Sequence, residues 1–230
     1  MVAVKEVEKP ARPVAGIDLG QKILAAAATE HGKALLYRGG ALKADYCYFE
    51  RRISNVDRML AKAEEADKAV LKEERRRLFE KRKRRRDQIY ANLAKHIAEE
   101  FQRLGINVVF VGHPRNIAQE KPGRCNTNMW GYRKLLQRLA TTFENYGIAA
   151  FAVDEHNSSK QCVLCGAPAK RVTRGLLRCP RGHIAHADIN AALNIMKRGL
   201  QALGIEATAP QQIHTESFVA APDRVTPIAP

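Results

Sequence analysis

The amino-acid sequence predicts an α/β protein in which helices cover both faces of a mixed, five-stranded sheet. Three observations lead to this prediction. Small and β-branched residues punctuated by glycine indicate a three-strand meander over residues 14–40. Two apolar runs, at 107–111 and 148–153, each begin soon after a glycine and resemble buried parallel strands. Helical patterns fill the intervals between the strands, and this alternation is typical of an α/β fold.

The helical segments each have their own evidence. Residues 44–104 contain no Gly or Pro, and apolar residues recur at helical spacing in their second half, so we expect a hairpin of two long helices. A further helix is expected over 129–146, with Gly147 at its end. The resulting units are a core at 14–157 that contains the hairpin insertion, a small module at 158–186, a last core helix at 187–202, and a flexible, Ala- and Pro-rich tail at 203–230.

The charge of the chain predicts a polyanionic partner. Thirty-nine Lys and Arg accompany twenty-four Asp and Glu, which gives a net charge of +15 and a pI near 9.9. Nucleic acid is the usual partner of such a protein. The segment 68–86 holds eleven Lys and Arg with three Glu, so we predict that it binds a phosphate backbone; a solvated helix surface is the alternative. The predicted contacts are Arg75, Arg76, Arg77, Lys81, Arg82, Lys83, Arg84, Arg85 and Arg86.

Other sequence features indicate the compartment. No apolar run approaches the ~20 residues of a membrane helix, so no membrane partner is expected. The segment MVAVKEVEKPARP lacks the apolar stretch of a secretory signal. Three of five cysteines have metal-ligand spacing, which favours a reducing interior over a disulfide framework. We expect a cytoplasmic, nucleoid-associated protein, and the sequence leaves its oligomeric state open.

A metal-binding pattern lies within residues 158–186. Cys162 and Cys165 form a CxxC knuckle, and after thirteen intervening residues Cys179 begins the motif C-P-R-G-H, which ends at His183. Two close pairs of soft ligands on two turns can converge on one tetrahedral zinc ion, so we predict a zinc ribbon with these four ligands. His186 is the alternative fourth ligand, and buried thiols without a metal are the alternative to the site as a whole.

Two aspartates lie where a sheet and a helix can bring them together. Asp18 ends the first apolar strand in GIDLG, and Asp188 opens the last helix in H-A-D-I-N-A-A-L-N-I. The small residues Ala191 and Ala192 would let that helix press closely on the sheet. The alternatives are an ordinary turn residue for Asp18 and a helix-dipole contact for Asp188. GIDLG also opens actin-like ATPases, but the chain offers no second phosphate-binding glycine motif.

These motifs together resemble one protein family. GIDLG, YRGG, the basic helical pair, NSSKQCVLCG and CPRGHIAHADINAALNI follow in the order seen in TnpB (OrfB) transposon-associated proteins, relatives of the type V CRISPR effectors. The resemblance runs from about residue 14 to residue 200, and the motif sequences are most similar to those of archaeal members. It implies an RNase H-like (RuvC) fold and metal-dependent, RNA-guided cleavage of DNA. It also implies that Asp18 and Asp188 match the first and third catalytic segments.

The second catalytic segment departs from the family pattern. Members usually have a Glu directly after the fourth strand, where this chain has Gly112 and His113. The fifth strand should lie beside the fourth, about 4.8 Å away, and it ends in AVDEHNSS. Glu155 is therefore the candidate replacement and Asp154 the next, and alternation along the strand should let one of them reach the site. The alternative is that both are solvated loop charges and the centre is inactive.

Hydrolysis of a phosphodiester is served by carboxylates that hold two Mg²⁺ or Mn²⁺ ions ~3.5–4 Å apart. The leading hypothesis is thus a DNA endonuclease with Asp18, Glu155 and Asp188 as ligands of the catalytic metal. The second is a nuclease-dead nucleic-acid-binding protein with the same fold. Family members generally carry amino-terminal domains that hold a guide RNA, whereas seventeen residues precede Asp18 here. The resemblance therefore supports nuclease chemistry more directly than RNA guidance.

Overall fold

A computed structural model describes residues 13–113, 131–154, 158–173 and 175–229, and its strands form two sheets. The large sheet contains β1 (Val14–Leu19), β2 (Ile23–Thr29), β3 (Lys33–Arg38), β4 (Val108–His113), β5 (Ala149–Asp154), β9 (His214–Ala220) and β10 (Val225–Ile228). The small sheet contains β6 (Lys170–Arg171), β7 (Leu176–Arg178) and β8 (Ile184–His186), and the described residues of 158–186, which include this sheet, are called the ribbon below. The helices are α1 (Gly40–Leu60), α2 (Glu65–Arg103), α5 (Tyr132–Asn145) and α6 (Ala187–Ala202), with a short 3-10 turn η1 (Ser158–Lys160).

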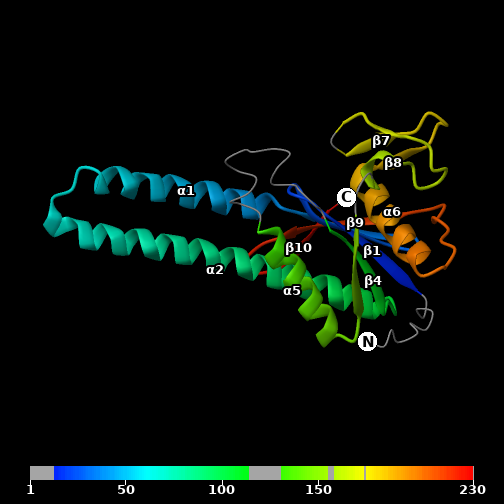
Figure 1. Ribbon diagram of the computed structural model, residues 1–230, viewed down its shortest axis with the longest axis horizontal. Coiled ribbons are helices and arrows are strands. Elements are labelled where there is room, and N and C mark those ends of the chain that lie inside the picture. Colours follow the sequence, from blue (N-terminus) through cyan, green and yellow to red (C-terminus); the bar gives the residue numbers. More distant parts are fainter. Residues whose placement is uncertain (1–12, 114–130, 155–157, 174, 230) are drawn as a thin grey trace, which may run out of the picture.

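The large sheet, whose strands β1, β4, β9 and β10 are labelled in Figure 1, is mixed, as predicted. It has seven strands rather than five, in the order β10-β9-β3-β2-β1-β4-β5. The first three strands form the expected antiparallel meander, and β4 and β5 continue from β1 in parallel. The parallel pairing places the carboxyl ends of β1, β4 and β5 at the same edge of the sheet. This is the edge at which the α/β topology gathers functional side chains.

The two additional strands correct the prediction of a flexible tail at 203–230. Strand β9 pairs in parallel with β3, and β10 pairs with β9 at the edge. Phe218 is buried and stacks on Tyr37, with ring centroids 5.2 Å apart. The segment covers the edge of β3, which would otherwise expose unpaired backbone groups. Its Pro227 is tolerated because β10 is an edge strand.

Helices cover both faces of the sheet. On one face, Ile89, Leu93, Ile97 and Phe101 of α2 join an apolar core with Leu135, Leu139 and Phe143 of α5. On the other face, α6 packs on β1, β2 and β4 through a second core. This second contact is unusually close: a Cβ on Gly16 would lie 2.1 Å from the carbonyl oxygen of Ala192, and a Cβ on Gly199 would lie 2.1 Å from the ring of Phe110. Glycine is therefore required on both surfaces.

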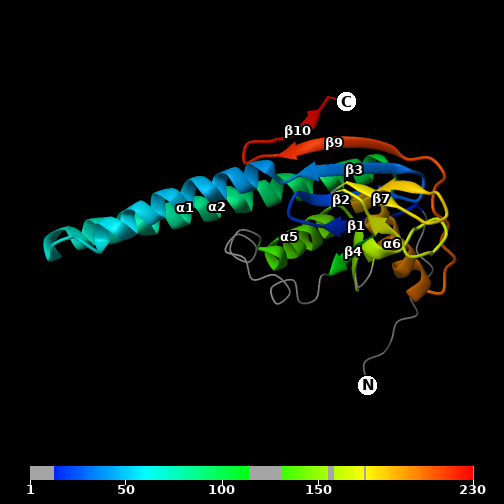
Figure 2. The same cartoon turned by 90° about the horizontal axis from the view of Figure 1, so that it is seen from above.

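The predicted helical hairpin is present as α1 and α2, and it extends well beyond the sheet (Figure 2). Its outer part has a small core of its own, formed by Phe49, Ile53, Val56 and Leu78. The inner half of α2 instead packs under the sheet. In the part of the chain that the structure describes, no helix is both long and apolar enough to cross a membrane.

The close contact of α6 with β1 gives a first prediction. We expect Gly16→Ala to lower the free energy of unfolding by about 1–3 kcal/mol, because the added methyl group overpacks the interface. Chemical denaturation followed by circular dichroism measures this change. Gly40→Ala is the matched control, because a Cβ at that position meets nothing within 4 Å. Equal unfolding midpoints for the two variants would contradict the close contact.

Candidate functional site

The structure brings the four predicted soft ligands together. The ligand atoms of Cys162, Cys165, Cys179 and His183 all lie within 4.8 Å of one another. Cys162 Sγ lies 3.6 Å from His183 Nδ1, and Cys165 Sγ lies 3.4 Å from Cys179 Sγ. Sulfur ligands about 2.3 Å from a tetrahedral zinc ion stand at similar separations. The cluster could therefore hold a metal such as zinc.

Two similar turns position these ligands. Gly166 and Gly182 have positive φ angles of 70° and 88°, which favour glycine. The N–H of Gly166 donates to the carbonyl of Cys162 at 2.8 Å, and the N–H of Gly182 donates to that of Cys179 at 3.0 Å. Each turn thus reverses the chain just after a cysteine, so that the ligands of both turns face one shared position. The alternative ligand His186 lies on β8, paired with Leu176, and is not part of the cluster.

The thiols of the cluster differ in acidity. The backbone N–H of Ala167 is the main cause that lowers the pKa of Cys165, to about 7. Burial raises the pKa of Cys179. Because a metal binds the thiolate form, binding would displace protons from both groups, and the affinity would rise with pH.

Two asparagines that the sequence analysis did not single out attach the ribbon to α6. The side chain of Asn190 accepts a hydrogen bond from the N–H of Val163 at 3.0 Å and donates to the carbonyl of Gln161 at 2.8 Å. Asn194 donates to the carbonyls of Ser158 and Gln161, both at 2.8 Å. Both asparagines are buried. Their spacing of four residues among the apolar residues 189–196 of the helix could have revealed them, because buried amides need partners.

Asp18 and Asp188 lie on surfaces that face each other. Asp18 is two residues after Gly16 on β1, so strand alternation places it on the face that α6 covers. Asp188 is in the first turn of α6, one turn before Ala192, whose carbonyl contacts Gly16. In Figure 1, α6 runs from the ribbon toward the end of the sheet at which β1 begins. The first turn of α6 therefore lies toward the carboxyl end of β1, where Asp18 is.

The contacts of Asp188 include one from the ribbon. The guanidinium Nη2 of Arg171, on β6, donates to Asp188 Oδ1 at 2.8 Å. The side chain of Asp188 is 19% exposed and that of Arg171 is 43% exposed. The N–H of Ala187 also donates to the carbonyl of Gly175 at 2.9 Å, so the ribbon contacts the start of α6 through both backbone and side chain.

The segment predicted to supply the second carboxylate is partly described. Gly112, the residue before the end of β4, lies on the α6 face and is paired with Val153, while His113 ends the strand and is paired with Asp154. The ring of His113 contacts that of Tyr132 on α5, at 5.9 Å between centroids, so this pair faces away from α6. Asp154 therefore lies on the opposite face of the sheet from Asp18. Glu155, the favoured candidate, lies outside the described residues.

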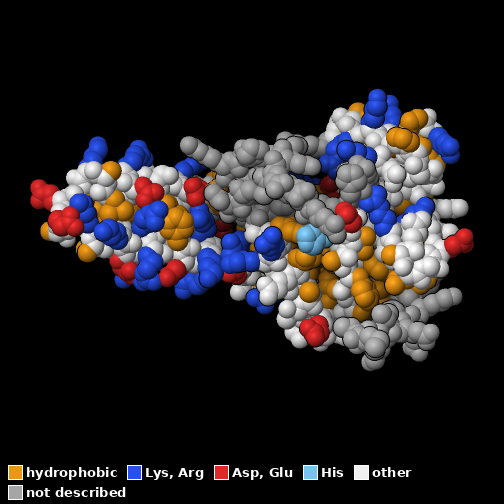
Figure 3. All heavy atoms as spheres, viewed as in Figure 1, with side chains coloured by type: hydrophobic (Ala, Val, Ile, Leu, Met, Phe, Trp, Pro, Cys, Tyr) orange, Lys and Arg blue, Asp and Glu red, His pale blue; other side chains and the backbone are white. Residues whose placement is uncertain are grey.

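The predicted nucleic-acid contacts on α2 fall into two groups. Six of the arginines form ion pairs with carboxylates. These pairs are Arg75–Asp57, Arg76–Glu73, Arg76–Glu80, Arg77–Glu73, Arg82–Glu50, Arg85–Asp45 and Arg86–Asp87. Hydrogen bonds from Arg76 and Arg77 lower the pKa of Glu73 to about 2, which keeps it ionised at neutral pH. Figure 3 shows acidic and basic side chains interspersed along the hairpin.

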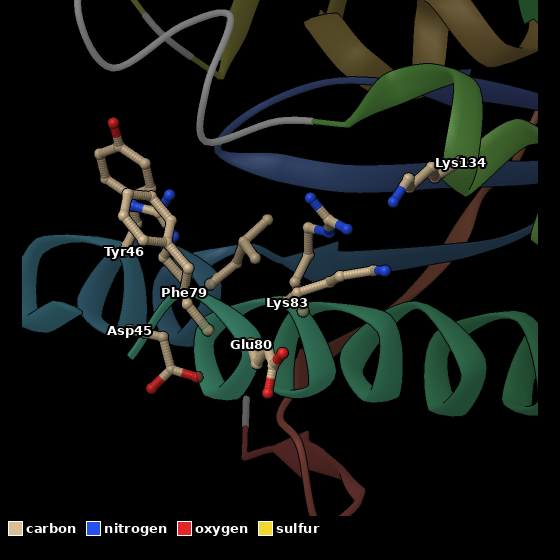
Figure 4. A pocket seen from close by; sticks show the side chains of 9 residues that line it. Asp45, Tyr46, Phe79, Glu80, Lys83 and Lys134 are labelled. Carbon is tan, nitrogen blue, oxygen red and sulfur yellow. The ribbon is translucent and has the colours of Figure 1, made fainter. Parts of the chain in front are cut away.

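The other three basic residues, Lys81, Lys83 and Arg84, are exposed and make no ion pair with a carboxylate within the described ranges. Lys83 borders a hollow of about 280 Å³ between the base of the hairpin and α5. Figure 4 shows Lys83 and Lys134 extending toward this space from α2 and α5, with Tyr46 and Phe79 at its other end. The uncompensated positive charge of this region therefore lies near the base of the hairpin.

Comparison with known proteins relates these features to one group. A family model described as OrfB_IS605, probable transposase, matches residues 1–118, and one described as Cas12f1-like, TNB domain, matches residues 132–195. The TnpB-like protein ORF457 of Acidianus two-tailed virus is 38% identical over 229 residues, which make up 97% of this chain and 49% of that protein.

Two solved structures resemble this one. The Cas12f1 protein of a Cas12f1-sgRNA-target DNA complex has a TM-score of 0.58 and 21% identity over 82% of this chain and 51% of its own. The mini-RNA-guided endonuclease CRISPR-Cas_phi3 has a TM-score of 0.53 and 15% identity over 86% of this chain and 46% of its own. At these identities the likeness concerns the fold. The chain spans about half the length of these proteins.

The metal cluster gives a second prediction. We expect the purified chain to retain one zinc ion per molecule, and Cys179→Ser to lose the ion and melt at a lower temperature, because metal binding stabilises the folded ribbon. Elemental analysis and thermal melting measure these changes. Cys47→Ser is the control, since Cys47 lies on α1, away from the cluster. Retention of stoichiometric zinc by the Cys179 variant would show that the assignment is wrong.

Proposed function

We propose that this chain, which belongs to the OrfB_IS605 family of probable transposases, is a divalent-metal-dependent DNA endonuclease with a RuvC-type centre. The observation that supports this most directly is the placement of Asp18 and Asp188 on the facing surfaces of β1 and α6. That placement comes with the ribbon and the mixed sheet, which are the other parts of the same architecture.

The proposed centre uses hard oxygen ligands for Mg²⁺ or Mn²⁺. Bound ions of this kind supply a nucleophilic water and neutralise charge on the phosphate. Asp18 and Asp188 fit such a role, because each is a partly exposed carboxylate at the edge where β1 ends and α6 begins. We assign the third ligand to Glu155. Asp154, the other candidate, faces α5 with His113 rather than α6 with Gly112 and Val153.

The cysteine and histidine cluster has a different proposed role. We assign it a structural zinc ion, because four soft ligands complete a tetrahedral shell and leave no position for substrate. This ion would keep the ribbon folded and, through Asn190 and Asn194, would hold it on α6 beside Asp188. The partner of the whole is DNA, and the solved relatives whose titles name guide RNAs support a guide RNA as a second partner.

A nuclease-dead nucleic-acid-binding protein is the second candidate, and one observation favours it. Gly112, the residue before the end of β4, lies on the α6 face and brings no carboxylate there. An active centre therefore depends on Glu155. If Glu155 does not serve as a ligand, the chain keeps the fold and the positive charge but lacks a complete set of metal ligands.

Cleavage assays separate the two candidates. We expect zinc-loaded protein, purified with its nucleic acid, to cleave DNA in the presence of Mg²⁺ or Mn²⁺. Asp18→Ala and Glu155→Ala should each reduce the rate by roughly 100-fold or more, because each removes a ligand of the charge-stabilising metal. Asp154→Ala is the matched control and should retain activity. Cleaved ends resolved on sequencing gels give the rates.

Two outcomes would change this assignment. No cleavage by folded, zinc-loaded protein with any copurified nucleic acid would favour the binding protein. Loss of activity in Asp154→Ala with full activity in Glu155→Ala would exchange their roles. Sequencing of the copurified nucleic acid tests the guide, because a guide RNA would be recovered as one defined RNA.

The division of α2 into ion-paired and unpaired basic residues predicts which of them bind nucleic acid. We expect Lys83→Ala/Arg84→Ala to weaken DNA binding about tenfold and to reduce the dependence of log K on log salt by roughly 0.9 for each phosphate that the variant no longer neutralises. Arg76→Ala/Arg77→Ala removes two charges from the same helix and serves as the control. It should have the smaller effect, because Glu73 and Glu80 already compensate those arginines. Fluorescence anisotropy over a salt series measures the DNA affinity of each variant. Equal losses of affinity in the two double variants would contradict the division between paired and unpaired residues.

A further inference from the structure

The ion pair between Arg171 and Asp188 is not explained by the stability of the ribbon alone. Arg171 stands on β6, where its backbone pairs with Leu177, and its side chain reaches out of the ribbon to the first turn of α6. An exposed arginine gains little from such a pair, since partly exposed ion pairs contribute little to stability. The carboxylate that it holds is nevertheless the one that we assign to the catalytic metal.

A guanidinium and a divalent cation compete for the same carboxylate oxygens. Arg171 Nη2 occupies Asp188 Oδ1 at 2.8 Å, which is the distance of a strong, charge-assisted hydrogen bond. A metal ion that approached this oxygen would meet a fixed positive charge. The pair therefore opposes metal binding at that oxygen by electrostatic repulsion and by occupying one of its lone pairs.

We propose that Arg171 is a positioning residue that guards the catalytic metal site: it holds Asp188 while nucleic acid is absent and releases it when a backbone phosphate takes the guanidinium. This inference rests on the proposed function, because it assumes that Asp188 is a metal ligand. It adds that nucleic acid and the metal bind with positive coupling through a single side chain.

A phosphate is a suitable competitor for Arg171. Guanidinium groups form paired hydrogen bonds with phosphate oxygens as readily as with carboxylates. The Arg171 side chain is 43% exposed, so a phosphate can approach it without unfolding the ribbon. Lys170 and Arg178, paired with each other on β6 and β7, are also exposed, but strand alternation places them on the other face of the ribbon, so Arg171 is the basic side chain of this strand pair that faces α6. The coupling is reciprocal by thermodynamic necessity, so bound metal should also favour nucleic acid.

The ribbon fixes the geometry of this contact. Strand β6 pairs with β7, and β7 pairs with β8, which leads directly into α6. The carbonyl oxygen of Gly175 also accepts a hydrogen bond from the N–H of Ala187 at 2.9 Å. Arg171 thus reaches Asp188 from a module that is attached directly before that residue, through β8 and Ala187, and movement of the Arg171 side chain can break the pair while the ribbon stays in place.

Manganese binding tests the proposal without any cleavage assay. The zinc-loaded chain, freed of nucleic acid, is titrated with Mn²⁺, and free Mn²⁺ is followed by electron paramagnetic resonance. We expect Arg171→Ala to bind Mn²⁺ about fivefold more tightly than the unchanged chain, which is the effect of a partly exposed ion pair. Arg178→Ala is the matched control: it removes the same charge from the same ribbon, and should leave the affinity within about twofold.

Two further arms identify the cause. Asp188→Asn combined with Arg171→Ala should abolish the gain, because the gain acts through that carboxylate. A DNA oligonucleotide with non-cleavable phosphorothioate linkages should tighten Mn²⁺ binding to the unchanged chain and should have less effect on Arg171→Ala. Zinc content and thermal melting confirm that each variant is folded.

The results separate this inference from the proposed function. If Mn²⁺ binds and is lost in Asp18→Ala, but Arg171→Ala binds no more tightly than Arg178→Ala, the guarding role is wrong and the metal site stands. An equal gain in both arginine variants would also overturn it, because general electrostatics would then explain the effect. If no variant binds Mn²⁺ with or without the oligonucleotide, the metal site and the guarding role both fail.

Discussion

The contact between α6 and β1 is the constraint on which the remainder of the site depends. Gly16 on the strand and Gly199 on the helix are both positions at which a Cβ would collide with the opposite element. Because the helix rests this closely on the sheet, Asp188 in its first turn can approach Asp18 at the end of β1, although both side chains are short. A larger residue at either glycine would raise the helix from the sheet and move Asp188 away from Asp18.

The ribbon also attaches to α6, so different residues of this helix contact the sheet and the ribbon. Ala192, Ile195 and Met196 pack on the sheet, whereas Asn190 and Asn194 hold the backbone within and just before the first metal knuckle. Buried amides are costly unless every polar group is paired, and here they are paired with backbone groups of one particular segment. This pairing specifies where the ribbon attaches, which an apolar contact of the same size would not do.

Much of this arrangement could be predicted from the sequence, because it rests on short-range patterns. The meander, the hairpin, the parallel strands and the four soft ligands follow from periodicity, from glycine placement and from ligand spacing. Strands β9 and β10 could not be predicted this way, because what orders them is the open edge of β3 and the ring of Tyr37, both distant in sequence. The ion pairs between the two helices were missed for the same reason: Asp45, Glu50 and Asp57 belong to α1, and their partners belong to α2.

Charge on the hairpin is therefore divided between structure and recognition. Arg82 lies over the rings of Tyr46 and Phe79, at 5.2 and 4.8 Å from their centroids, and joins α1 to α2. Such an arginine stabilises the hairpin whether or not nucleic acid is present, and it would have to leave both rings in order to turn toward a phosphate. Lys83 and Arg84 form no ion pair with a carboxylate among the described residues, and they lie where the hairpin meets the core. A polyanion bound there would lie against the base of the hairpin, close to the sheet rather than at the distant tip.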